Sequence, residues 1–519
     1  MSTTSLDTRA RRQIFAELET RAFDVAVIGG GITGAGIARD AAMRGLSVAL
    51  VEARDFASGT SSRSSKMIHG GLRYLAQGDI ALVKEAASER QILRRIAPHL
   101  TRLSPFLIPT TNMAMAAKLR TGLWTFEKLG GVPEAEKHEV IGLAELRRRE
   151  PLMRTDKLNG AILYPEFLTD DARLVLANIR SAHAASAVVV NHAAASELTS
   201  DGLVATSTLD DNLGATIKAK LVVNAAGAWV DQVRGLEAGE CDARMSLSRG
   251  IHLVLQRERL PINSTIIIRA PDKRSIFAVP RGAFTYIGTT DVFHDGADYW
   301  PAPAREDIDY LLRATESALR VDPIRDAEIV SLWSGVRPLI AQPGKKASEV
   351  SRKDEIWTSP GEMISIAGGK LSAYRAMAER VVDLAIERLG SSARPCSTAD
   401  APLPGGSGSF GDSMSRLDPR AAERLAGLYG DEASEIVDAG GAVAPEAVRA
   451  VTHEGAAKLE DYWVRRSARA WFDHGAGLAA LAPAADAMGA LLGWDDAMKA
   501  AQIAHCRQIN DASRRLLGE

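Results

Sequence analysis

Apolar residues near the start of the chain form two short runs separated by a glycine turn and a helical stretch. Residues 24–28 are an apolar run rich in valine and isoleucine that ends at a turn over residues 29–34, and helix-forming residues then continue to Arg44. Residues 47–52 form the second apolar run. A strand, a tight turn, a helix and a strand within about thirty residues are typical of a parallel α/β sheet.

The pattern changes in the middle third of the chain. Short apolar runs alternate there with proline, glycine and charged turns, which predicts an antiparallel sheet inserted into the parallel α/β fold and forming a substrate chamber. The predicted strands are residues 251–255, 264–269, 274–279 and 284–288. Helical periodicity is found at residues 171–182 and 306–319.

The last third is predicted to be helical. After Gly368-Gly369-Lys370, apolar residues recur every three or four positions as far as Leu389, which predicts a one-sided helix. Residues 401–411 are rich in glycine and proline and are interpreted as a linker. Alanine-rich helical patterning over residues 412–519 predicts a separate C-terminal helical domain.

The predicted fold class is therefore α/β, a Rossmann-like nucleotide-binding fold with an inserted antiparallel substrate sheet and a C-terminal all-α domain. Residues 1–22 are an N-terminal extension, and residues 23–400 hold the interleaved nucleotide-binding and substrate-binding domains. The substrate sheet is expected mainly over residues 245–330.

Composition narrows the function classes. The chain of 519 residues is 46% hydrophobic with a net charge of −2, which argues against general nucleic-acid binding. Three widely spaced cysteines indicate a reducing cytoplasm and neither a disulfide framework nor a metal site. Residues 1–22 lack the apolar core of a secretory signal. Residues 475–494 are apolar but contain Pro483 and Asp486, which favours a buried helix pair over a membrane span.

The glycine turn has the spacing of a dinucleotide-binding motif. Gly29 is expected to allow the tight turn, Gly31 the close approach of a pyrophosphate, and Gly34 the packing of helix on strand. The helix start would direct free N–H groups at the anion. Glu52 ends the next strand, where a carboxylate binds ribose hydroxyls. A turn without a ligand is the plainer alternative, but the strand, helix and acid around it favour the dinucleotide.

The same motif serves FAD and NAD, so other residues must distinguish them. The run from Ser61 to Lys66, followed by His69-Gly70-Gly71, offers the hydroxyl and backbone donors that a buried flavin needs, although a solvated loop has a similar composition. Gly368-Gly369-Lys370 opens a helix whose dipole and lysine would stabilise the negative N1/O2 edge of a reduced flavin. This second motif favours FAD.

Several longer motifs, in this order, resemble those of the FAD-dependent (aerobic) glycerol-3-phosphate dehydrogenases, which share their fold with the D-amino-acid oxidases. The resemblance runs from about Phe23 to Arg375. The motifs are Ser64-Ser65-Lys66-Met67-Ile68-His69-Gly70-Gly71-Leu72-Arg73-Tyr74-Leu75, residues 170–178, residues 287–291, Ser334-Gly335-Val336-Arg337-Pro338 and Gly368-Gly369-Lys370-Leu371, with a looser match at Trp463-Val464-Arg465-Arg466.

The resemblance implies oxidation of sn-glycerol 3-phosphate to dihydroxyacetone phosphate, with electrons passing from FAD to a membrane quinone. It implies a protein on the cytoplasmic face of the inner membrane, and a homodimer is expected, although the sequence patterns themselves do not define the oligomeric state. Two departures stand out: a longer N-terminal extension, and Ser372-Ala373 where two threonines are expected. The second departure removes one hydroxyl group and puts one minor contact with the substrate or the flavin in doubt.

The reaction requires cations for a phosphate dianion and a base for the alcohol proton. Arg73, Arg337 and Lys370 are the predicted cations, and Tyr74 is a further hydrogen-bond donor. His252 is either the base or a structural histidine, and Arg337 is the other group expected at the reacting hydroxyl. His69 is expected beside the flavin. The predicted cofactor contacts are Gly29, Gly31, Gly34, Glu52, Ser61, Ser62, Ser65, Lys66, His69, Gly70, Gly71, Gly227, Gly335, Gly368, Gly369, Lys370 and Leu371.

Three alternatives stay open. Residues 113–129 place apolar residues beside Lys118, Arg120 and Lys128, as in an interfacial helix or an ordinary half-buried one. The protein is alternatively a flavin oxidase for another polyol phosphate or an amino acid. A flavin-dependent RNA-modifying protein is disfavoured by the charge balance and by the absence of a basic stretch studded with aromatic residues.

Overall fold

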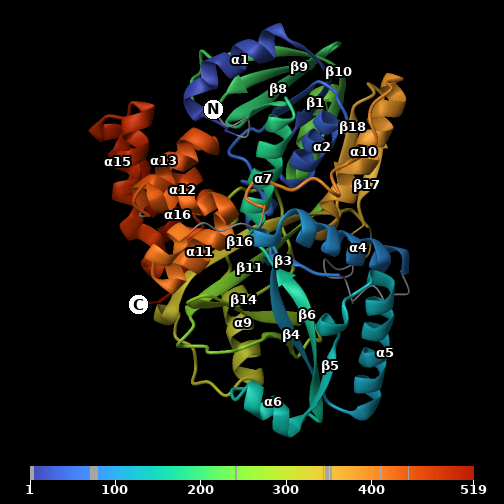
Figure 1. The fold of residues 1–519 in the computed structure, drawn as a ribbon, viewed down its shortest axis with the longest axis vertical. Coiled ribbons are helices and arrows are strands. Elements are labelled where there is room, and N and C mark those ends of the chain that lie inside the picture. Colours follow the sequence, from blue (N-terminus) through green and yellow to red (C-terminus); the bar gives the residue numbers. More distant parts are fainter. Residues whose placement is uncertain are drawn as a thin grey trace.

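The computed structural model describes residues 5–70, 80–239, 242–342, 344, 350, 353–407, 412–441 and 443–518. Two sheets lie one above the other in Figure 1, and a group of helices in orange and red lies beside both. The eight-stranded sheet is the nucleotide-binding part, and the ten-stranded sheet forms the lower half of the molecule.

The eight-stranded sheet has the main strand order β17-β18-β10-β1-β2-β7, with β8 and β9 added beside β10. Its central strand β1 is parallel to both β10 and β2, as the apolar runs predict. The strands are β1 (Ala22–Ile28), β2 (Val48–Val51), β7 (Val188–Val190), β8 (Ala193–Thr199), β9 (Gly202–Ser207), β10 (Gly214–Asn224), β17 (Glu355–Thr358) and β18 (Ile364–Ala367).

Alternate residues of β1 enter different cores because successive side chains of a strand point to opposite faces. Val25 and Val27 pack under the helices α2 (Ile32–Met43), α7 (Asp171–Ala184) and α10 (Tyr374–Leu389). Ala26 and Ile28 belong to the opposite core, which includes Phe15 of α1 (Arg11–Thr20). Within the predicted N-terminal extension, α1 is therefore packed against the nucleotide-binding fold, while Leu6 and Thr8 form hydrogen bonds with the C-terminal region.

The ten-stranded sheet is larger than the sequence predicts. Strands before residue 245 and after residue 330 join it, because pairing over long sequence separations leaves no local pattern. Its strands are β3 (Met67–Ile68), β4 (Arg102–Thr110), β5 (Glu139–Gly142), β6 (Gly160–Leu168), β11 (Met245–Gln256), β12 (Thr265–Arg269), β13 (Ser275–Arg281), β14 (Phe284–Gly288), β15 (Val292–Phe293) and β16 (Ile329–Ile340).

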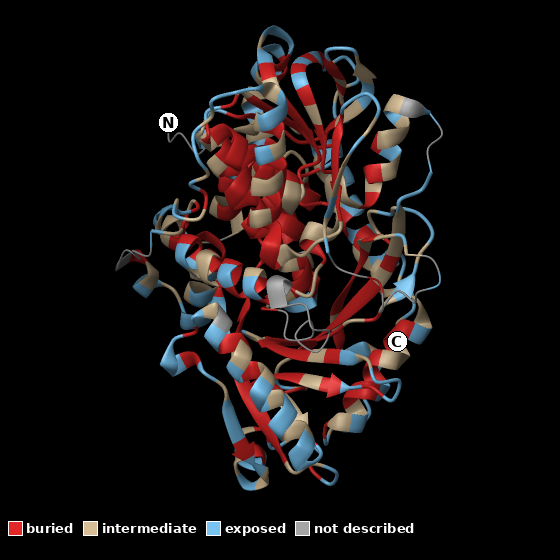
Figure 2. Ribbon diagram, turned by 90° about the vertical axis from the view of Figure 1, so that its right-hand side faces the viewer, coloured by how far each residue is buried: buried red, intermediate tan, exposed pale blue. Residues whose placement is uncertain are grey.

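One face of this sheet packs on α9 (Arg305–Ala318) through Ile251, Leu253 and Leu311. The other face packs Tyr286 and Trp333 against residues of the C-terminal helices. Figure 2 shows that buried residues concentrate in the strands of both sheets and in the helices packed against them. Remaining helices are α4 (Ile80–Ile96), α5 (Met113–Gly130), α6 (Leu143–Arg149) and α8 (Val230–Ala238).

The C-terminal region is helical. Part of its apolar interior is shared with the larger sheet, and a smaller cluster around Leu428 and Ile436 is its own. Trp471 packs at 5.8 Å from Trp333 of β16, measured between ring centroids. The segment predicted as a linker is also packed where it is described, since Leu403 is buried and its N–H donates to the Ile96 carbonyl. The helices are α11 (Pro419–Tyr429), α12 (Ala433–Asp438), α13 (Val443–His453), α14 (Arg469–Phe472), α15 (Leu481–Leu492) and α16 (Asp496–Arg514).

Among the described residues, one segment, His474–Leu492, has the length and composition of a membrane-crossing helix. Its backbone is interrupted, because Gly475, Ala476 and Gly477 have left-handed φ values. The regular α-helix that follows, α15, has 12 residues, whereas a span needs about 20. The segment packs as a 3₁₀ turn and a single α-helix, whereas a pair of helices was expected.

Candidate functional site

A large cavity of ≈ 1280 Å³ lies where the carboxyl ends of the parallel strands meet the larger sheet. Small-molecule pockets usually measure about 300–1,000 Å³, so this cavity has room for a dinucleotide and a small substrate together. Most of the predicted site residues line it: Gly29, Gly31, Glu52, Ser61, Ser65, His69, Gly227, His252, Gly335, Arg337, Gly368, Gly369, Lys370 and Leu371.

The glycine turn between β1 and α2 is closed by direct backbone contact. A Cβ atom on Gly34 would lie 1.9 Å from the Gly29 carbonyl oxygen, so no side chain fits there. Gly29 has a φ of +111°, and a Cβ there would lie 2.6 Å from the Ala225 carbonyl oxygen. Gly31 lines the cavity at the N-terminus of α2. The turn therefore has the roles that the spacing predicts: Gly29 and Gly34 permit packing, and Gly31 faces the ligand space.

Glu52 is held at the end of β2 by two backbone donors. Its Oε2 accepts from Gly30 N–H at 2.7 Å and its Oε1 accepts from Arg54 N–H at 2.8 Å. Burial raises the pKa of Glu52, and these two hydrogen bonds oppose that rise. The carboxyl group lies on the cavity wall with acceptor positions left on each oxygen, which suits the two hydroxyls of a ribose.

The serine run divides between the cavity and the protein interior. Ser61 Oγ accepts from Ile32 N–H at 3.0 Å, in the first turn of α2, and Ser61 and Ser65 line the cavity. Ser62, Lys66 and Gly70 do not line it. Their assignment as cofactor contacts is a prediction that this geometry does not favour.

Lys66 has a structural partner instead of a ligand. Its Nζ donates to Asp171 Oδ1 at 2.5 Å and to the Ser62 carbonyl at 3.1 Å, and both Lys66 and Asp171 are buried. Asp171 also accepts from the Ser64 hydroxyl at 2.7 Å. A buried ion pair with additional hydrogen bonds is satisfied internally, so Lys66 shapes the serine loop.

The late glycine turn returns the chain to the same cavity. Gly368 and Gly369 have φ values of +77° and +78°, and a Cβ on Gly369 would lie 2.4 Å from the Met377 methyl carbon. Lys370 precedes a short 3₁₀ turn, Leu371–Ala373, which continues into α10. The helix start with Lys370 thus faces the cavity, as predicted, with one 3₁₀ turn before the α-helix.

His252 lies in the middle of β11 on the cavity side. Its ring stacks on Trp333 at 4.7 Å, and its Nε2 is 2.9 Å from Ser65 Oγ. Its Nδ1 is buried without a hydrogen-bond partner among the described residues. Burial, then the positive charges of Arg337 and Lys66, hold the pKa of His252 well below its ordinary value. The imidazole is therefore neutral at pH 7 and able to accept a proton.

Arg337 comes from β16, which pairs with β11 along its length. Its Nη2 donates to Thr289 Oγ1 at 2.7 Å, and its Nη1 lies 3.4 Å from Asp291 Oδ1. Gly250 makes room for the guanidinium, since a Cβ there would lie 2.3 Å from Nη2. Strand pairing thus places the predicted cation and His252 on one wall.

Other residues of the wall carry no strong local signal. Trp229 stacks on Tyr299 with 4.3 Å between the ring centroids, and the Arg54 guanidinium lies over the Tyr299 ring, 3.9 Å from its centroid. Glu166 is buried, accepts from Gly70 N–H at 3.0 Å and pairs with Arg90. Lys273 and Arg274 come from a turn before β13. Of these, only the charged turn Asp272-Lys273-Arg274 could be found from sequence, as a charged loop next to a substrate strand.

Gly71, Arg73 and Tyr74 lie outside the described residues, so their predicted roles stay predictions. Cys241 lies outside them too. The cations that the structure describes on the cavity wall are Arg63, Lys273, Arg274, Arg337 and Lys370.

The residues present fit FAD. The glycine cradle admits a pyrophosphate, Glu52 suits a ribose, and a second helix start with a lysine lies on the wall of the same cavity. The hydroxyls of Ser61 and Ser65 supply further polar contacts.

Comparison with known proteins agrees with this geometry. Residues 24–375 match the family model of the FAD dependent oxidoreductases, and residues 396–499 match the C-terminal domain of alpha-glycerophosphate oxidase. An aerobic glycerol-3-phosphate dehydrogenase of Staphylococcus aureus is 37% identical over 506 residues, covering 90% of this chain and 91% of the relative.

Among solved structures, the glycerol-3-phosphate dehydrogenase from Bacillus halodurans, complexed with FAD, has a TM-score of 0.82 and 31% identity over 99% of each chain. The L-alpha-glycerophosphate oxidase from Mycoplasma pneumoniae, with FAD bound, has a TM-score of 0.56 at 16% identity, covering 74% of this chain and 100% of that one, which shows the fold alone. The chain therefore belongs to the FAD-dependent oxidoreductases, and within them to the family of the aerobic glycerol-3-phosphate dehydrogenases.

Proposed function

We propose that this protein oxidises sn-glycerol 3-phosphate to dihydroxyacetone phosphate and passes the electrons to a membrane quinone. The observation that carries the proposal is the convergence of His252, Arg337 and Lys370 on the wall of the cavity that contains the glycine turn. These residues come from β11, β16 and the turn after β18. The names of the related proteins support the substrate.

The chain's own residues have separate tasks in this proposal. Bound FAD supplies the hydride acceptor. Arg337 presents a planar pair of donors to the anionic substrate, and Lys370 adds a second positive charge. His252 is the proposed base: its neutral Nε2 accepts the alcohol proton in exchange for the hydrogen bond with Ser65 Oγ. Buried Trp333 stacks on the imidazole and fixes the orientation of its ring.

A substrate panel tests the proposal. The purified holoenzyme is assayed with a quinone-analogue dye against glycerol 3-phosphate, glycerol and a neutral amino acid, and peroxide is measured in parallel without dye. We expect dye reduction with glycerol 3-phosphate alone and little peroxide. Dye reduction with glycerol equal to that with the phosphate would refute the role of the cations, and stoichiometric peroxide would favour the oxidase.

Membrane contact is proposed through α5. Met113 and Trp124 are 77% and 56% exposed, and Lys128 lies 5.9 Å from the centroid of the Trp124 ring. Exposed apolar side chains beside cations are typical of a helix lying in a membrane interface. A homodimer on the cytoplasmic face of the inner membrane is part of the same proposal.

Vesicle flotation with anionic lipid tests this surface. We expect the protein to float with the vesicles and Trp124→Ala to float less. Val448→Ala, at a side chain that is 38% exposed on α13, is the matched control and should float normally. A protein that stays at the bottom of the gradient would end this part of the proposal.

A further inference from the structure

The segment Trp463-Val464-Arg465-Arg466 lies in the protein interior. It forms one π-helical turn, Asp461–Arg466, in which Arg465 and Arg466 are 1% and 0% exposed. Arginine is almost never fully buried unless it is paired. This segment is therefore no surface for a partner, and the function of its two guanidinium groups depends on what they pair with.

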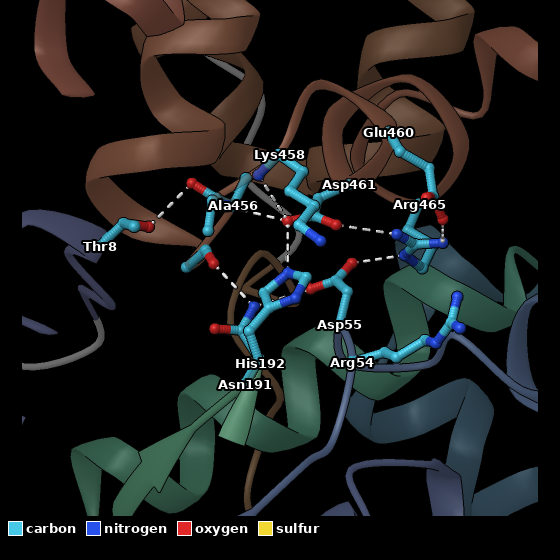
Figure 3. A network of polar contacts seen from close by, with 12 residues as sticks. Thr8, Arg54, Asp55, Asn191, His192, Ala456, Lys458, Glu460, Asp461 and Arg465 are labelled. Atoms are coloured by element: carbon cyan, nitrogen blue, oxygen red, sulfur yellow. Dashed lines mark hydrogen bonds and ion pairs between the residues drawn. The ribbon is translucent and has the colours of Figure 1, made fainter. Parts of the chain in front are cut away.

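Both arginines pair with Asp55, more than 400 positions earlier in the chain. Arg465 Nε and Arg466 Nη1 both contact Asp55 Oδ2, and Arg466 Nη2 donates to Oδ1 at 2.8 Å. Arg465 also donates to Glu460 Oε1 and Asp461 Oδ1, each at 2.9 Å. Figure 3 shows Asp55 facing Arg465, with Glu460 and Asp461 on other sides of the same guanidinium group. The C-terminal region thus forms ion pairs with one side chain of the nucleotide-binding fold.

Asp55 belongs to the loop that carries the cofactor contacts. The loop runs from Glu52 to Ser61, and both of these residues line the cavity. Asp55 lies between them and points away, into the arginine pair. The loop is tied to the glycine turn as well, since Ala57 N–H donates to the Gly30 carbonyl at 3.0 Å. Asp55 is thus anchored in a loop whose backbone is also bonded to the glycine turn.

His192, in the bend between β7 and β8, completes the network. Its Nε2 lies 3.0 Å from Asp461 Oδ2, and its backbone N–H donates to the Arg54 carbonyl at 2.5 Å (Figure 3). Asp55, His192 and Asp461 have ligand atoms close enough to hold a cation. However, each of the four carboxylate oxygens already accepts from arginine, asparagine, histidine or backbone donors. The cluster is an ion-pair network and acts by holding the loop.

We infer that Arg465 and Arg466 are positioning residues for the adenosine half of FAD, acting through Asp55 on the loop from Glu52 to Ser61. They touch neither cofactor nor substrate. The nucleotide-binding fold carries the glycine turn and Glu52. The C-terminal region completes the site by fixing the loop from Glu52 to Ser61. The inference rests on FAD binding and is independent of the identity of the substrate.

Flavin selectivity distinguishes positioning from general stability. FMN contains the isoalloxazine and one phosphate but lacks the adenosine half, so it does not use the ribose contact of Glu52. We expect Asp55→Asn to weaken FAD binding to the stripped apoprotein about tenfold, the lower end of the effect of removing a group that orients a binding residue. FMN affinity should stay within twofold of the wild type. Fluorescence titration measures both constants, without substrate.

Two further variants make the result decisive. Arg180→Gln removes an ion pair of the same interface, Arg180 Nη1 to Glu432 Oε2 at 2.7 Å, which does not touch the loop, and should leave both affinities unchanged. If Asp55→Asn does not fold, Arg465→Lys is measured in its place, because lysine keeps the charge but not the three contacts. Unchanged FAD binding in Asp55→Asn or in Arg465→Lys, or equal losses for FAD and FMN, would overturn the inference.

The double variant Glu52→Gln with Asp55→Asn tests the route of the effect. If Asp55 acts through the loop that presents Glu52, adding Asp55→Asn to Glu52→Gln should weaken FAD binding by less than half as much as Asp55→Asn does alone, on a logarithmic scale. Full additivity would mean that the two residues act independently and would contradict the proposed route.

Discussion

The two ends of the cavity are built in different ways. The dinucleotide end uses Gly29, Gly31, Gly34 and Glu52, which lie within one strand-turn-helix-strand unit. The glycines act through backbone shape and N–H groups, and Glu52 adds one carboxylate. The substrate end uses side chains of His252, Arg337 and Lys370, which strand pairing and a late turn bring together. A cofactor site that depends on backbone geometry tolerates little change in volume. A substrate site made of side chains can be changed one charge at a time while the cofactor stays bound.

The largest expected effect concerns the substrate end alone. His252→Ala should slow anaerobic flavin reduction at saturating substrate by about 10²- to 10⁴-fold, the usual contribution of a general base, with FAD still bound. Stopped-flow absorbance measures this rate. An unchanged single-turnover rate would remove His252 from the mechanism and leave it as a structural histidine.

Gly34→Ala should affect the opposite end. The added methyl group meets the Gly29 carbonyl oxygen at 1.9 Å, and overpacking of this kind costs about 1–3 kcal/mol or more, so FAD affinity should fall about 100-fold. Gly235→Ala in α8, where a Cβ meets nothing within 4 Å, is the matched control. Equal FAD affinity in the two variants would show that the turn is not the cofactor cradle.

Arg337→Ala tests whether the substrate end can be changed separately from the dinucleotide end. It should reduce kcat/KM for glycerol 3-phosphate without loss of FAD. Charge-assisted hydrogen bonds contribute about 1.5–3 kcal/mol, which predicts a decrease of roughly 10- to 100-fold in steady-state kinetics. Arg325→Ala, at a side chain that is 79% exposed just before β16, is the control. Undiminished kcat/KM would refute the assignment of Arg337.

The smallest predicted effect is on the pH profile. Only neutral His252 accepts a proton, so the rate of flavin reduction falls as the pH drops through the pKa of this group. Burial and the charges of Arg337 and Lys66 keep that pKa well below 6.5, so the rate at saturating substrate should change less than about threefold between pH 6.5 and 8. Arg337→Ala removes one of those charges and should move the fall to higher pH. A wild-type inflection at 6.5 or above would contradict this account.

The same contrast explains what could be predicted from the sequence. The glycine turn, its helix and strand β14 agree closely with the structure because spacing and apolar periodicity are local properties. Strands β4 and β6 were missed as members of the larger sheet, since their partners lie far away in sequence. The partners of charged residues are the hardest feature to predict from the sequence. Lys66 lies in a motif of the family but pairs with Asp171, and no local pattern identifies such a distant partner.

The most direct test of the central claim is the visible absorbance spectrum of the purified protein before and after glycerol 3-phosphate is added without oxygen. The account predicts a yellow protein whose flavin band disappears with sn-glycerol 3-phosphate and persists with glycerol. A colourless protein that cannot take up FAD, or a bound flavin that stays oxidised in the presence of the phosphate, would contradict it.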